Sequence, residues 1–102
     1  MNGQQPAQPG QKQIQIKIED TVLKGVYTNA MAVSHSKEEF VLDFMNIYPH
    51  QGIGIVSGRV ITSPGHLKRI ISALSENLKK YESNFGKVKE AEAPSEIGFK
   101  TS

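Results

Sequence analysis

The sequence predicts an α+β fold in which a four-stranded antiparallel meander sheet is followed by one long C-terminal helix packed on one face. Two observations support this class. Short segments with a period of two fill the first part of the chain, and an apolar pattern of helical period covers residues 64–85. The links between segments are too short for the crossovers of about a dozen residues that parallel neighbours require.

The first two expected strands cover residues 13–18 and 25–34. In the first, polar residues alternate strictly with Ile14, Ile16 and Ile18, so one face is apolar. Residues 25–34 are small, tolerate an extended backbone and place apolar side chains on both faces. We therefore expect the second strand to lie close to its neighbours.

The third expected strand covers residues 40–47, where apolar side chains occupy both faces and Asp43 is the exception. A short helix is the alternative, because Ser36 and Glu39 have the spacing of a capping box. Alternation that continues as far as Ile47 favours the strand. After a turn at 49–52 the fourth strand covers residues 53–62, where glycines indicate a bulge or a close neighbour.

The C-terminal helix has the clearest boundaries. Ser63 is a suitable N-cap, Pro64 fits the first helical position, and Gly86 ends the pattern. The apolar side chains between these ends share one side of the helix, which predicts a face that packs on the sheet. They are Leu67, Ile70, Ile71, Leu74, Leu78, Tyr81 and Phe85.

Length and composition predict a single domain at residues 13–86, with a disordered tail at 1–12 and a flexible tail at 87–102. The 102 residues include no cysteine, and the formal net charge is +2. No apolar run approaches the roughly 18 residues of a membrane span, and the first residues lack the pattern of an export signal. We expect a cytoplasmic protein without a membrane partner.

No arrangement of side chains indicates catalysis, a metal or a cofactor, so we expect neither an enzyme nor a bound cofactor. The three histidines, His35, His50 and His66, lack the spacing of a metal-ligand motif. The start of the helix exposes backbone N–H groups beside basic side chains, which suits a small anion. The residues of this candidate anion site are Gly65, His66, Lys68 and Arg69.

The apolar faces also predict self-association. One helix covers one face of a sheet, whereas the second and third expected strands offer apolar side chains to both faces. A two-fold axis would bury the remainder against a copy of the chain. The residues expected at this homo-oligomer interface are Tyr27, Met31, Val33, Val41, Met45 and Ile47.

Four blocks of the sequence resemble a family of small prokaryotic proteins of about this length. They are residues 24–29, 35–44, 59–64 and 66–69, of which the Phe-Val-Leu-Asp-Phe run at 40–44 is the most distinctive. The family is a domain of unknown function, so the resemblance implies no activity, cofactor or site residue. In outline, an antiparallel sheet followed by a long helix is also similar to the export chaperone SecB.

Together these features predict a non-catalytic, homo-oligomeric protein-interaction module of the chaperone or adaptor kind. The missing catalytic constellation and the strands with two apolar faces support this prediction. The alternative is a nucleic-acid-associated regulatory protein, which the basic side chains of the helix and a pI of about 8.9 favour.

Overall fold

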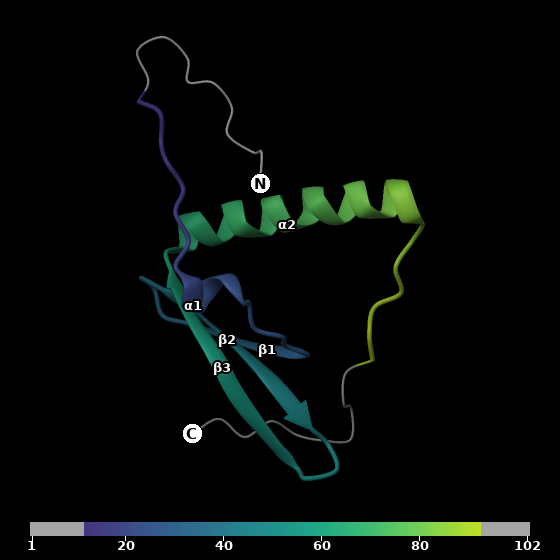
Figure 1. The fold of residues 1–102 in the computed structure, drawn as a ribbon. Helices are drawn as coiled ribbons and strands as arrows, with labels where there is room; N and C mark the ends of the chain where they lie inside the picture. The colour runs from purple at the N-terminus through teal and green to yellow at the C-terminus, as the bar shows by residue number, and fades with distance from the viewer. Residues whose placement is uncertain (1–11, 93–102) are drawn as a thin grey trace.

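The computed structural model describes residues 12–92 of the chain and confirms the α+β class (Figure 1). The expected tails lie outside the described residues over 1–11 and 93–102. In chain order the elements are α1 (Asp20–Leu23), β1 (Ala30–His35), β2 (Phe40–Tyr48), β3 (Ile53–Thr62) and α2 (Pro64–Phe85). The strands form one antiparallel sheet in the order β1-β2-β3, so β2 is central.

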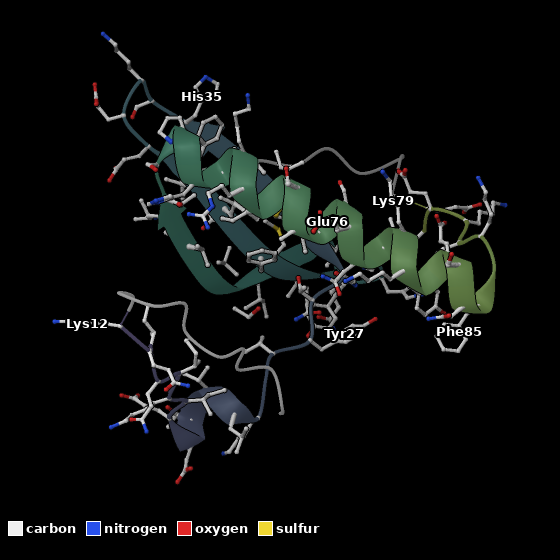
Figure 2. All side chains as sticks on the ribbon, turned by 90° about the horizontal axis from the view of Figure 1, so that it is seen from above. Lys12, Tyr27, His35, Glu76, Lys79 and Phe85 are labelled. Carbon is white, nitrogen blue, oxygen red and sulfur yellow. The ribbon has the colours of Figure 1, made fainter. Side chains whose placement is uncertain are left out.

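The prediction of four strands is wrong, because the described residues contain three. Residues 13–18 adopt no strand, and Figure 2 shows the segment from Lys12 to α1 standing off from the sheet. Alternation makes one face of a segment apolar, but a strand also needs a neighbour that takes up its backbone hydrogen bonds. Residues 13–18 are not part of the sheet, whose strands are β1, β2 and β3.

The second strand is shorter than predicted, because it begins at Ala30 and not at residue 25. Side chains hold the preceding residues against the end of β2. The Thr28 hydroxyl donates to the Met45 carbonyl oxygen at 2.7 Å. The Asn29 side chain binds both the N–H and the carbonyl oxygen of Ile47, at 2.8 and 3.2 Å. Together with one backbone bond, from the Asn29 N–H to the Met45 carbonyl oxygen at 3.2 Å, these side-chain bonds hold the segment along β2 without making it a strand.

The two hairpin links explain why the third and fourth predicted strands are correct. In the first link the Ser36 hydroxyl accepts from the N–H groups of Glu38 and Glu39, and the Ser36 N–H donates to the Glu39 carbonyl oxygen at 2.9 Å. The capping-box residues therefore close a turn, and the alternative helix is wrong. In the second link Gly52 has φ 66°, a left-handed conformation that glycine adopts without strain.

A bulge in β3 accounts for part of its glycine content. Phe44 on β2 is opposite Gly58, but the next residue, Met45, is opposite Val56, so Ser57 is the extra residue. The Ser57 hydroxyl donates to the Phe44 carbonyl oxygen at 3.3 Å. Gly58 thus adjoins a bulge and Gly54 has a close neighbour in Ile47, the two features that the sequence predicts for these glycines, and the bulge bends the strand at this point.

The register assigns the side chains to two faces of the sheet. Residues directly opposite each other share a face. The face that we call the Leu42 face carries Leu42 and its partners Val33 and Val60, and the Ile47 face carries Ile47 and its partner Gly54. Among the described residues only Leu42 and Ile47 are buried, with 7% and 8% of their surface exposed. Each face therefore holds one buried apolar residue.

The long helix has the predicted ends. The Ser63 hydroxyl accepts from the His66 N–H at 3.2 Å, and the Gly86 N–H donates to the Glu82 carbonyl oxygen at 2.9 Å. Its packing differs from the prediction, because no residue of α2 is buried and only Leu67 and Ile70 among its apolar side chains are half-buried. In Figures 1 and 2 the C-terminal half of α2 projects beyond the sheet.

Candidate interaction surface

An exposed apolar stripe lies along α2. We call it the α2 stripe, and it consists of the seven apolar residues that the sequence places on one side of this helix. Its last five members are between 50% and 74% exposed. The rings of Tyr81 and Phe85 contact each other at a centroid distance of 4.9 Å, which orders the C-terminal end of the stripe. The members are Leu67, Ile70, Ile71, Leu74, Leu78, Tyr81 and Phe85.

The sheet also exposes apolar side chains on both faces. Met31 and Val33 on β1 are exposed on the Leu42 face, and Val56 and Ile61 on β3 are exposed on the Ile47 face. A monomer in water gains nothing from leaving such side chains uncovered on two faces and a helix. The described surface is therefore well suited to contact with other protein surfaces.

The six residues predicted at an oligomer interface do not form one surface. Met31 is opposite Phe44 and Val33 is opposite Leu42, so both lie on the Leu42 face. The β2 members of the set lie on the Ile47 face, where Ile47 itself is buried. Tyr27 precedes β1 and is exposed, while its carbonyl oxygen accepts from the Asn46 side chain at 2.8 Å. The members on the Ile47 face are Val41, Met45 and Ile47.

One charged pair lies on the Ile47 face. Asp43 on β2 is directly opposite Arg59 on β3, and the guanidinium donates two hydrogen bonds to the carboxylate. Hydrogen bonding from Arg59 lowers the pKa of the Asp43 carboxyl below its ordinary value of 3.8; burial opposes this shift and the charge of Arg59 adds to it. The same contact raises the pKa of Arg59. The hydrogen bonds therefore hold one negative and one positive charge side by side among apolar neighbours on this face.

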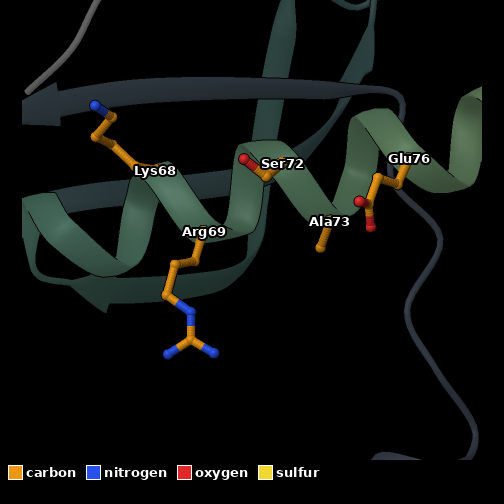
Figure 3. Close-up of a pocket in the computed structure, with 5 residues that line it drawn as sticks. All are labelled: Lys68, Arg69, Ser72, Ala73 and Glu76. Atoms are coloured by element: carbon orange, nitrogen blue, oxygen red, sulfur yellow. The ribbon is translucent and has the colours of Figure 1, made fainter.

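The candidate anion site does not form a converging cradle. The Ser63 hydroxyl already takes the N–H of His66, and Figure 3 shows Lys68 and Arg69 extending to opposite sides of α2. Both side chains border a shallow depression on the outer side of the helix, which Glu76 also lines. Binding of an anion by Gly65, His66, Lys68 and Arg69 stays a prediction.

Metal ligation has no counterpart in the part of the chain that the structure describes. Over residues 12–92 no three side chains among His, Cys, Asp and Glu come together as a group able to hold an ion. His35 instead contacts the Phe40 ring at a centroid distance of 5.2 Å. Within the same residues, no helix has the length and apolar character needed to cross a membrane.

The sequence did not indicate two of the contacts that order this surface. Asn29 forms hydrogen bonds with the backbone of Ile47, and Arg59 forms them with the Asp43 carboxylate. Both contacts join residues that are far apart in the sequence. An acidic residue inside an apolar strand is a signal that a cationic partner lies opposite, but the partner itself depends on the strand register. The amide of Asn29 gave no comparable signal.

These features define a small α+β domain with a three-stranded antiparallel sheet and an exposed amphipathic C-terminal helix. The chain belongs to the family described as "Protein of unknown function (DUF3467)", whose model matches residues 1–90. This match confirms the family that the sequence blocks resemble. No curated protein and no solved structure matches the chain at a significant level. The similarity in outline to SecB is not shown by these comparisons.

Proposed function

We propose that this chain is a cytoplasmic, non-catalytic protein-interaction module that associates with itself, of the adaptor or chaperone kind. The observation that carries the proposal is the contrast between two buried apolar residues and an exposed α2 stripe over residues 12–92. The absence of cysteine from the sequence is consistent with a reducing compartment.

A small domain is stable only if burial of apolar surface exceeds the loss of conformational entropy. Fully burying one side chain of the size of leucine or phenylalanine contributes about 1.5–3 kcal/mol. A chain that buries Leu42 and Ile47 alone gains little, whereas covering the α2 stripe adds several such contributions. Association therefore supplies a core that the single chain lacks.

The adaptor or chaperone role rests on the number of exposed apolar regions. The α2 stripe is one region, and the exposed side chains of β1 and β3 are others. A module that used one region for a copy of itself would still offer another to a second protein. This arrangement supports a protein client as the further partner.

The alternative is nucleic-acid association, and one observation favours it. Lys68, Arg69, Lys79 and Lys80 are all exposed on α2. Glu76 lies between them, so the cationic surface is interrupted. Binding through phosphate contacts would weaken steeply with salt, because each contact releases counterions.

Sedimentation equilibrium of the full chain tests the proposal. We expect a mass of at least twice 11.2 kDa at tens of micromolar protein, with little change between low and high salt. A monomer mass under these conditions would contradict self-association. In parallel, titration with generic single-stranded and double-stranded nucleic acid at increasing salt tests the alternative. Strong binding that disappears with salt would favour it.

A further inference from the structure

We infer that the second copy docks on α2 with its own α2, in antiparallel orientation about a two-fold axis. This inference rests on the proposed self-association and specifies its contact surface, orientation and register. This arrangement is supported by the spacing of the α2 stripe, by its exposed area, and by the charges and side-chain sizes along it.

The spacing within the stripe is that of a helix-pairing seam. Six of its members are separated alternately by four and three residues, so they occupy the two inward positions of successive heptads. At about 100° per residue they fall within an arc of about 80°. A pattern this narrow and regular fits a second helix better than the flat face of a sheet. The six are Leu67, Ile71, Leu74, Leu78, Tyr81 and Phe85.

The exposed area is large enough for a stable contact. Five of these side chains are half to three-quarters exposed, and each has a total area on the order of 150–250 Å². They offer on the order of 600 Å² per copy, or about 1,200 Å² for two copies, which reaches the lower end of stable protein interfaces. Contacts between the ends of α2 and the other sheet would add to this area.

Charges along one flank of the stripe set the orientation. Lys68, Ser75 and Glu82 follow one another at intervals of seven residues beside the seam. In an antiparallel pair, equivalent flanks face each other, so that Ser75 lies opposite Ser75 of the other copy and Lys68 lies opposite its Glu82. The two-fold axis generates this ion pair twice. In a parallel pair this flank would face the Ile70, Asn77 and Asn84 flank, which carries no charge.

Side-chain size supports the same orientation. The seam is aliphatic at its N-terminal end and aromatic at its C-terminal end, where Tyr81 and Phe85 stand. In the antiparallel register Leu67 meets Phe85 and Ile71 meets Tyr81, so each layer combines a larger and a smaller side chain. In a parallel pair, the aromatic residues of one copy would pack against the same aromatic residues of the other copy. The layers at the N-terminal end would then contain only the smaller aliphatic side chains.

The described conformation leaves both charged partners, Lys68 and Glu82, available for the ion pair. Lys68 is exposed, and the Glu82 carboxylate uses Oε2 to accept from the Val88 N–H at 2.9 Å, which leaves Oε1 for a cation. The C-terminal half of α2, from about Glu76 to Phe85, projects beyond its own sheet (Figure 2). A second helix can therefore lie along it.

Single-cysteine crosslinking tests orientation, since the native chain has no cysteine to interfere. In the proposed register the two copies of residue 75 are about 3 Å apart along the helix axis, whereas the two copies of residue 84 are about 24 Å apart. A short bis-maleimide should therefore join Ser75→Cys subunits efficiently and Asn84→Cys subunits hardly at all. Efficient joining at both positions would indicate parallel helices and overturn the inference.

If the crosslinker joins neither cysteine variant although sedimentation gives a dimer mass, the two copies associate through a surface other than α2. That result overturns the inference and leaves the proposed self-association intact. A monomer mass for the unmodified chain overturns both. The same mass measurement on each cysteine variant, before crosslinker is added, shows whether the substitution itself has disrupted the dimer.

Charge reversal tests the register independently. Lys68→Glu places like charges opposite each other at two sites and should raise the dissociation constant about tenfold. Residue 68 is exposed in the second turn of α2 and takes part in no packing within its own chain, so this variant should fold. Glu82→Lys should have a similar effect, and the double variant should recover most of the affinity. Lys79→Glu, outside the flank, is the control; failure of the double variant to recover would overturn the assigned register.

Discussion

The Asp43 carboxylate on β2 and the Arg59 guanidinium on β3 form a two-point ion pair, with Nε to Oδ1 at 2.6 Å and Nη2 to Oδ2 at 2.9 Å. The two residues are direct cross-strand partners, although 15 residues separate them in the sequence. The Asp43 side chain is 17% exposed and that of Arg59 is 62% exposed. The pair explains how an acidic residue fits into an otherwise apolar strand, because its charge is matched at the surface where it emerges.

This pair should make stability depend on pH in the acid range. The folded pKa of Asp43 is lowered, so its contribution is fully present above its ordinary value near 3.8 and is lost as pH falls through the folded pKa. In urea unfolding between pH 2 and pH 7, the stability difference between wild type and Asp43→Asn should shrink below about pH 4.

Arg59→Gln should reduce the same pH dependence, because it removes the donor that lowers the pKa of Asp43. Arg69→Gln is a matched control, since Arg69 is exposed on α2 and its side chain extends away from the helix in Figure 3. An Arg59 variant whose acid profile equals that of wild type would show that the ion pair does not form in solution.

Asn29 should matter more for stability than an exposed asparagine ordinarily does. Asn29→Ala removes both hydrogen bonds to the backbone of Ile47 and leaves those backbone groups without their side-chain partner. We expect a loss of about 1–3 kcal/mol in the free energy of unfolding. Asn46→Ala, which removes one exposed bond to Tyr27, should cost about 0.5–1.5 kcal/mol. Denaturant titration of both variants compares them, and equal losses would contradict the role given to Asn29.

The sequence predicted those parts of the fold that local signals determine. Ser63, Pro64 and Gly86 predict the two ends of α2. In the structure the Ser63 hydroxyl caps the first turn and the Gly86 N–H donates to the last turn, as these residue types imply. The extended residues of β2 and β3 were likewise predicted from alternation. At the ends of α2 the deciding interactions lie within a few residues of each other, and β2 and β3 are neighbours because the short turn at 49–52 joins them directly.

The parts that the sequence did not predict depend on which segments meet. Ile14, Ile16 and Ile18 have the alternation of a strand, yet the segment forms none, because alternation does not supply a neighbouring edge. The split of the predicted interface residues between two faces follows from the β1–β2 register, which one sequence does not fix. The partner of Asp43 depends on the β2–β3 register in the same way.

Gly54 should tolerate a side chain less well than Gly58. A Cβ added at Gly54 would lie 2.7 Å from Cδ1 of Ile47, one of the two buried residues, whereas a Cβ at Gly58 would meet nothing within 4 Å. Gly54→Ala should therefore cost about 1–3 kcal/mol through overpacking. Gly58→Ala should be neutral or slightly stabilising, because alanine restricts the unfolded chain. Urea midpoints measure both; a neutral Gly54 variant would mean that Ile47 moves aside freely.

Leu74 should affect stability through association and not through the core of the single chain. Its side chain is 66% exposed in the middle of the α2 stripe, so truncating it removes little packing within one copy. In the proposed helix pair it packs against Leu78 of the other copy in two symmetric layers, where loss of a buried leucine costs about 2–5 kcal/mol.

The wild-type melting temperature should accordingly rise with protein concentration, because dimer formation stabilises the folded state by mass action. At concentrations where wild type is dimeric, Leu74→Ala should melt about 8–40 °C lower. The difference should narrow as the protein is diluted. Lys80→Ala, on the opposite side of α2, is the control and should follow wild type throughout. A Leu74 variant that is destabilised equally at every concentration would place this side chain in a core of the single chain, against its exposure in the structure.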